Sequence, residues 1–112
     1  MSYDLEILAK IENGQYICID EPKHRSPTYN LGKMFRAAMD WDFDQSTIYN
    51  VADIFENIQR GIDELERQPE KYVQYEPENK WGTVSSALED LKSLRDCILE
   101  QDIDTKYLYM RW

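Results

Sequence analysis

The sequence is poor in the residues that most often carry chemistry. It has one histidine, His24, and two cysteines, Cys18 and Cys97, which lie far apart. They show no zinc-ligand spacing, and no pattern places a serine or cysteine nucleophile on a strained turn beside His24. The sequence therefore predicts a protein without metal, cofactor or catalytic activity, whose two thiols are reduced and buried.

Long apolar runs are missing as well. No stretch is long enough to span a membrane, and the first ten residues alternate apolar and charged side chains instead of forming a signal peptide. Of the 112 residues 42% are hydrophobic and 31% are charged. This composition predicts one soluble, cytoplasmic domain over residues 1–112 that does not bind membranes.

Charge is unevenly distributed along the chain. Residues 1–36 carry five acids and five bases, so the net charge of −9 arises within residues 37–112. Residues 22–39 contain no acid, and residues 40–59 contain no base. The base-free run predicts an acidic, partner-binding face, whose members are Asp40, Asp42, Asp44, Asp53 and Glu56. Such a charge repels phosphates, so direct nucleic-acid binding is not expected.

The three aspartates of this run have the spacing that opens an EF-hand calcium loop. The match ends there, because the sixth position needs glycine and is Gln45, and the twelfth needs glutamate and is Val51. We therefore expect no calcium site at residues 40–51.

Apolar periodicity predicts the secondary structure. Alternation with period two predicts strands over residues 3–11, 15–20 and 106–112, the first two joined by a turn at Asn13-Gly14. Steps of three and four residues predict helices over 31–39, 46–68 and 83–98, with one further turn at 69–72. Asn30 and Thr83 are the expected caps of the first and third helices, and Ser46 or Asn50 caps the central one.

These elements predict an α+β domain with the order β-β-α-α-α-β. The C-terminal strand needs a partner, and only the N-terminal hairpin can supply one. We therefore expect a three-stranded antiparallel-type sheet with the N-terminal strand in the middle and three helices packed on one face.

A second candidate site surrounds the start of the first predicted helix. A helix N-terminus offers unpaired N–H groups to an anion, and nearby bases would add positive charge. Aromatic side chains from the two long loops could stack on a nucleotide base if the loops meet. The candidate residues are Arg25, Tyr29, Asn30, Lys33, Arg36 and Trp81.

Several spaced segments together resemble a known family. They are Met1-Ser2-Tyr3-Asp4, Thr28-Tyr29-Asn30 running into Met34-Phe35, Gly61-Ile62 followed by Leu65, Pro69 to Tyr72, and Pro77-Glu78-Asn79-Lys80-Trp81-Gly82. These segments are similar to a family of short proteins of phages, prophages and bacteria. The last loop of that family usually reads Asn-Pro-x-Asn-Gly-Trp-Gly, from which this chain departs at Glu76 and Lys80. The resemblance implies a phage or mobile-element setting and draws attention to the two loops, but implies no activity.

Two functional hypotheses follow. In the first, the protein is a non-enzymatic interaction protein that inhibits a host defence or regulatory protein with a basic surface, through its acidic face. In the second, it binds or sequesters a nucleotide-type anion at the basic loop and the first helix. Self-association is compatible with either hypothesis.

Overall fold

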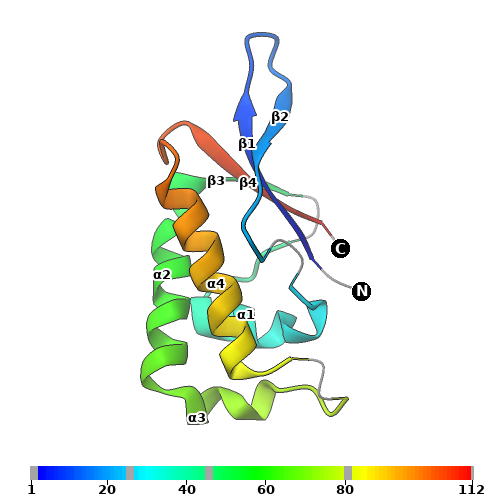
Figure 1. Ribbon diagram of the computed structural model, residues 1–112, viewed down its shortest axis with the longest axis vertical. Coiled ribbons are helices and arrows are strands. Elements are labelled where there is room, and N and C mark those ends of the chain that lie inside the picture. The colour runs from blue at the N-terminus through cyan, green and yellow to red at the C-terminus, as the bar shows by residue number, and fades with distance from the viewer. Residues whose placement is uncertain (1–2, 25–26, 45–46, 80–81, 112) are drawn as a thin grey trace.

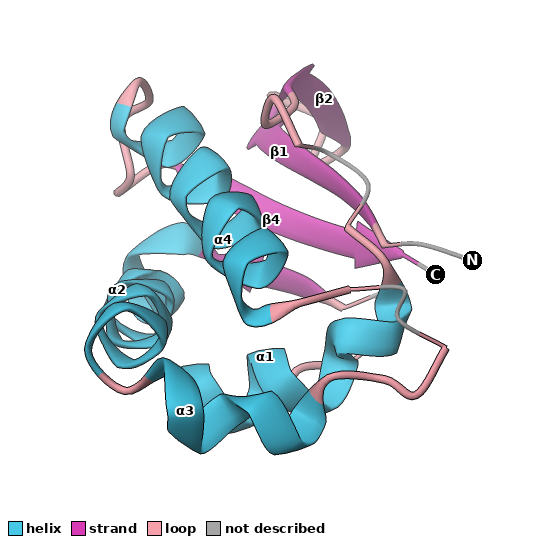
Figure 2. Cartoon of the chain, turned by 60° about the horizontal axis from the view of Figure 1, so that its bottom comes forward, coloured by secondary structure: helices cyan, strands magenta, loops and turns pink. Residues whose placement is uncertain are grey.

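The structure is a computed structural model that describes residues 3–24, 27–44, 47–79 and 82–111. Within these ranges the elements follow in the order β1 (Asp4–Lys10), β2 (Tyr16–Asp20), the 3₁₀ turn η1 (Tyr29–Leu31), α1 (Gly32–Met39), β3 (Ile48–Asn50), α2 (Val51–Arg67), α3 (Pro69–Tyr72), the 3₁₀ turn η2 (Val73–Tyr75), α4 (Val84–Leu99) and β4 (Lys106–Arg111). They form an α+β domain in which the helices cover one face of an antiparallel sheet (Figures 1 and 2).

The sheet has the strand order β2-β1-β4-β3. The N-terminal strand β1 pairs antiparallel with both β2 and β4, which confirms its predicted interior position. Leu5 and Ile7 of β1 lie opposite Met110 and Leu108 of β4, and all four side chains are buried. The alternation in these strands thus turns one apolar face toward the helices.

The prediction of three strands is wrong, because residues 48–50 form a fourth. They were predicted to belong to the central helix, but β3 pairs with β4, with Ile48 opposite Tyr109 and Tyr49 opposite Leu108. Asn50 is the N-cap of α2 and accepts a hydrogen bond from the amide of Ala52 at 3.2 Å. Of the two expected caps, Asn50 is thus confirmed, while Ser46 lies outside the described residues. The spacing of Ile48 and Val51 also fits a helix, so periodicity alone extended α2 one turn too early.

The number of helices also differs from the prediction. In the described part of the chain there are four α-helices instead of three, because the turn after Pro69 forms a separate helix, α3. Thr83 caps α4 as expected, in a capping box with Ser86. Asn30 does not cap α1, because the chain first makes η1 and the helix starts only at Gly32.

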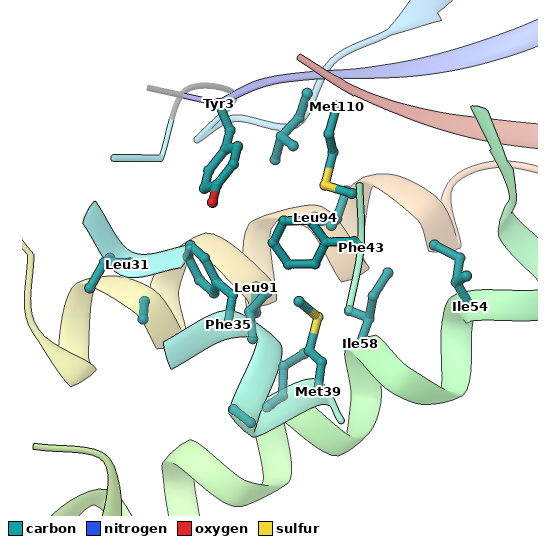
Figure 3. Packing of buried hydrophobic residues seen from close by; sticks show 14 of the residues in the cluster. Tyr3, Leu31, Phe35, Met39, Phe43, Ile54, Ile58, Leu91, Leu94 and Met110 are labelled. Carbon is teal, nitrogen blue, oxygen red and sulfur yellow. The ribbon is translucent and has the colours of Figure 1, made fainter. Parts of the chain in front are cut away.

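The core lies between the sheet and helices α1, α2 and α4. The apolar stripe predicted for the central helix is buried from Val51 to Leu65 except at Phe55, which is half-buried, whereas Ile48 lies in β3 and is exposed. Phe43, from the connector between α1 and β3, is also buried and lies between the sheet and the helices (Figure 3). Phe43 thus closes this edge of the core, while Trp41, two residues earlier, is half-buried against it.

Gly61 lets three helices approach closely. A Cβ atom at this position would lie 2.6 Å from Cγ of Met39 in α1 and 2.9 Å from Cδ1 of Leu91 in α4. Both separations are shorter than van der Waals contact, so a side chain here would push the helices apart. The glycine interrupts the stripe of α2 because the core has no room for a side chain.

The two cysteines differ in their surroundings. Cys97 on α4 is buried, as predicted, and burial raises the pKa of its thiol to about 12. Cys18 on β2 is exposed, so the prediction that both thiols are buried is wrong for Cys18. β2 is an edge strand and its side chains have few neighbours to cover them. None of the helices in the described ranges has the length and apolar character needed to cross a membrane.

Candidate functional site

The acidic surface comprises Asp40, Asp42, Asp44, Asp53 and Glu56, and all five residues are exposed. Three of them lie in the connector that follows α1, and two lie on the first turns of α2.

Hydrogen bonds join the connector to α2 at one end and to β3 at the other. The side-chain amide of Asn57 on α2 donates to the backbone carbonyl of Met39 at 3.1 Å and to that of Asp40 at 3.5 Å. The hydroxyl of Tyr49, just before α2, accepts a hydrogen bond from the amide of Asp44 at 2.7 Å. The connector therefore runs along the N-terminal half of α2.

Asp53 lies one helical turn before Asn57 and shares its side of α2, whereas Glu56, the residue directly before Asn57, is turned about 100° around the helix. The hydrogen bonds of Asn57 thus bring the chain at Met39 and Asp40 alongside the side of α2 that carries Asp53. A single surface formed by all five acidic residues stays a prediction. Trp41 also packs edge-on against Tyr49, with ring centroids 4.8 Å apart, which further fastens residues 40–44 beside β3.

Arg36, at the edge of the acidic surface, already interacts with Phe43 and Asp42. The guanidinium of Arg36 donates to the carbonyl of Phe43 at 3.2 Å and lies 4.2 Å from the centre of the Phe43 ring. Its Nε atom is 3.5 Å from the carboxylate of Asp42, whose side chain is 98% exposed. An exposed pair of this kind is worth at most about 1 kcal/mol, so Asp42 remains available to a partner.

The second candidate site corresponds to a groove of about 610 Å³ between the start of α1 and residues 74–78. Three of the predicted anion-binding residues, Asn30, Lys33 and Arg36, line this α1 groove. Arg25 and Trp81 lie outside the described residues, as does the side chain of Tyr29. The structure therefore brings three of the six predicted anion-binding residues together in one groove.

The α1 groove is not uniformly basic. Glu76 and Glu78 line it as well, which balances the charges of Lys33 and Arg36. The side chain of Asn30 donates to the hydroxyl of Thr28 at 3.0 Å instead of capping the helix. Glu76 accepts a hydrogen bond from the amide of Val84 at 2.8 Å and so belongs to the start of α4. The groove could hold a small polar ligand, but its carboxylates oppose a strongly anionic one.

One polar cluster was missed by sequence reasoning. Nδ1 of His24 lies 3.4 Å from the carboxylate of Asp90 on α4, and the backbone amide of His24 donates to the hydroxyl of Ser93 at 2.9 Å. Burial raises the pKa of Asp90 to about 6, against the opposing influence of His24. Because Ser93 accepts from the backbone and not from the imidazole, this arrangement fastens the loop to α4 and does not activate a nucleophile.

Within the described ranges one group of side chains has the spacing of potential metal ligands. The ligand atoms of Glu6, Cys18 and Glu21 all lie within 4.8 Å of one another at the base of the hairpin. Burial and the two carboxylates raise the pKa of the Cys18 thiol, which opposes the thiolate that a metal requires. The expectation of a protein without metal stays a prediction.

Comparison with protein families, curated proteins and solved structures finds no match to this chain. The resemblance to short phage, prophage and bacterial proteins therefore stays a prediction.

Proposed function

We propose that this protein is a small non-enzymatic interaction protein whose acidic surface binds a basic surface of another protein. The observation that supports the proposal is that five exposed carboxylates lie in two segments, residues 40–44 and the first turns of α2, which the hydrogen bonds of Asn57 and Tyr49 hold together. Clustered like charges repel one another, so they are most favourable when a cationic partner neutralises them.

The arrangement suits recognition more than chemistry. The connector backbone is held by Asn57 and Tyr49, so the carboxylates are presented in a defined order at little further entropic cost. Complementary charges accelerate association and select basic partners. A protein surface that normally receives nucleic-acid phosphates is a suitable target, because its lysine and arginine side chains donate hydrogen bonds to carboxylates as well as to phosphates.

The resemblance to short phage and prophage proteins supports the proposal that a phage or mobile element encodes this protein and that it binds a host protein. In that setting the partner is a host defence or regulatory protein, and occupation of its basic surface inhibits it. The partner is therefore expected to lose nucleic-acid binding when this protein is present.

Affinity capture from a bacterial lysate with three forms of the protein tests the proposal. The first is the wild type, and the second has all five residues of the acidic surface changed to Asn or Gln. The third is a matched control with the same loss of charge elsewhere, at Glu12, Asp63, Glu66, Glu70 and Asp104. We expect a partner that the wild type and the control capture and the acidic-surface variant does not. Equal loss with both variants would contradict the proposal, because net charge alone would then explain the capture.

A second candidate function is the binding of a small phosphate-bearing ligand in the α1 groove. It is favoured by the convergence of Asn30, Lys33 and Arg36 on one groove at the start of a helix. The carboxylates of Glu76 and Glu78 restrict the candidates to ligands that also carry hydrogen-bond donors, as nucleotide bases do.

Thermal unfolding with ATP, GTP and cyclic mononucleotides tests this second function. A ligand at about 100 times its Kd stabilises the fold by about 2.7 kcal/mol, which a melting curve detects readily. The shift should disappear in Lys33→Glu and persist in Lys10→Glu, a control on the exposed hairpin. Unchanged melting with every nucleotide would exclude this function.

A further inference from the structure

β2 presents an unpaired edge in the described part of the structure. It is the outermost strand of the order β2-β1-β4-β3 and pairs on one side only, with β1. The amide of Ile11 donates to the carbonyl of Gln15 at 2.9 Å, which sets the alternation of hydrogen-bonded pairs along this hairpin. Ala9 and Ile17 then bond to each other, and the backbone N–H and C=O groups of Tyr16 and Cys18 point away from β1.

Apolar side chains cluster along the same strand. Tyr16, Ile17 and Ile19 are 38%, 45% and 41% exposed. The hairpin extends beyond the helices, so the helices do not cover its far end (Figure 1). Proteins usually protect such an edge, because open N–H and C=O groups beside apolar side chains favour pairing with another chain.

An acid-rich groove lies beside the base of this strand. It measures about 530 Å³ and separates the end of β2 and the following loop from α4. Two hydrogen bonds hold its walls together, from Gln101 to Asp20 at 2.8 Å and from His24 to Ser93 at 2.9 Å. Two lysines, Lys23 and Lys92, line this β2–α4 groove together with five carboxylates, those of Asp20, Glu21, Glu89, Asp96 and Glu100.

We propose that the β2 edge accepts an extended, positively charged segment of another protein as an added strand. The segment bonds to the backbone of Tyr16 and Cys18, in the manner of peptides that extend an exposed sheet edge. A β-bulge after Cys18 puts Ile17 and Asp20 on the same face of the sheet, because they pair with Ala9 and Ile7. On that face the segment carries apolar side chains beside Ile17 and basic side chains beside Asp20, over the β2–α4 groove. A second copy of this chain does not fit the groove, because it would bring a net charge of −9 toward the same carboxylates.

This binding site is separate from the acidic surface. The acidic surface adjoins β3, at the opposite edge of the sheet from β2. Binding at the two sites can therefore be tested separately. Variants of the acidic surface should leave peptide binding at the β2 edge unchanged.

Fluorescence anisotropy with short labelled peptides tests the proposal. The probe is a peptide of about seven residues, within the range of strand lengths, whose alternate positions on one face carry valine in one half and lysine in the other. A glutamate–valine peptide of the same length serves as the control ligand. We expect the lysine–valine peptide to bind and the glutamate–valine peptide not to bind.

Two substitutions of Cys18 distinguish backbone pairing at the β2 edge from non-specific electrostatic attraction of the peptide. Cys18→Pro removes the amide that points outward, a change that edge strands tolerate, whereas Cys18→Ala keeps the amide. Binding should weaken by about tenfold or more in Cys18→Pro and change by less than about twofold in Cys18→Ala. Asp96→Asn with Glu100→Gln should also weaken binding, whereas Asp63→Asn with Glu70→Gln, outside the groove, should not.

Three results would overturn the proposal. The first is failure of the lysine–valine peptide to bind. The second is equal binding by Cys18→Pro and Cys18→Ala, provided that circular dichroism shows both variants folded. The third is a dimer in analytical ultracentrifugation that Cys18→Pro abolishes, because the edge would then serve a second copy of the chain.

Discussion

The side-chain amide of Asn57 donates to the backbone carbonyl of Met39 at 3.1 Å and joins the end of α1 to the side of α2 that carries Asp53. The chain then turns through Asp40, whose φ of 50° is in the left-handed region, and enters the connector. Aspartate tolerates this conformation better than most residues. Asn57 thus links the two halves of the acidic surface.

Asn57→Asp should destabilise the protein by roughly 1–3 kcal/mol. The change replaces a donor with a carboxylate that faces two carbonyl oxygens, while helix propensity stays similar. Urea unfolding measures the effect, and Gln59→Glu, the corresponding change two residues further along α2, is the control. Equal stability of the two variants would show that the Asn57 hydrogen bonds do not hold the connector.

Leu108→Ala should destabilise the protein by about 2–5 kcal/mol, because it opens a cavity beneath the sheet. Leu108 is fully buried on β4, between Ile7 of β1 and Tyr49 of β3. Lys106→Ala on the same strand is a control that should cost less than about 1 kcal/mol. Thermal or urea unfolding decides the outcome, and a similar small effect of both changes would contradict the placement of β4 inside the sheet.

The contribution of Asp90 to the free energy of unfolding should fall as pH rises from about 4 to about 6. Burial raises the pKa of Asp90 to about 6 in the folded state, against about 3.9 in an unfolded chain. A raised pKa favours the folded state while the group is protonated, and this contribution is lost as pH rises through the folded pKa. The difference corresponds to roughly 2–3 kcal/mol.

The Asp90→Asn variant isolates this effect from other carboxylates. The difference in unfolding free energy between wild type and variant should change across this pH range and stay constant above about pH 7. A difference independent of pH would show that Asp90 titrates normally in the folded protein.

The two thiols should react at very different rates. The raised pKa of Cys18 lowers its thiolate fraction at about pH 8, but its exposure should still let it react with a thiol reagent such as 5,5′-dithiobis(2-nitrobenzoate). Buried Cys97, whose pKa is about 12, should react only after unfolding. Cys18→Ser should remove the fast phase and Cys97→Ser should leave it. Two equally fast phases in the folded wild type would contradict the burial of Cys97.

Sequence periodicity predicted the fold where one face of an element is buried and the other is exposed. β1, β4, α2 and α4 satisfy this condition, and all four occur close to their predicted ranges. β3 was missed because three residues are too few to establish a period, and its pairing with β4 is a contact between distant parts of the chain. The late start of α1 has a similar cause, because η1 continues the same apolar spacing.

The two candidate sites differed in how far sequence could predict them. The acidic surface was visible as a base-free run, because most of its members are close in the chain. His24 and Asp90 are 66 residues apart, so no local pattern could pair them. The carboxylates of Glu76 and Glu78 enter the α1 groove through tertiary packing, which a reading of residues 25–36 alone could not include.

Binding of a basic partner by the acidic surface is tested most directly by the salt dependence of the affinity for the captured protein. Isothermal titration calorimetry would measure Kd for the wild type and for the variant with the acidic surface neutralised, at about 50 mM and about 500 mM NaCl. We predict that the wild-type affinity falls steeply with salt, while the variant binds weakly and with little salt dependence. An affinity that is indifferent to salt, or a variant that binds as tightly as the wild type, would contradict a function based on the acidic surface.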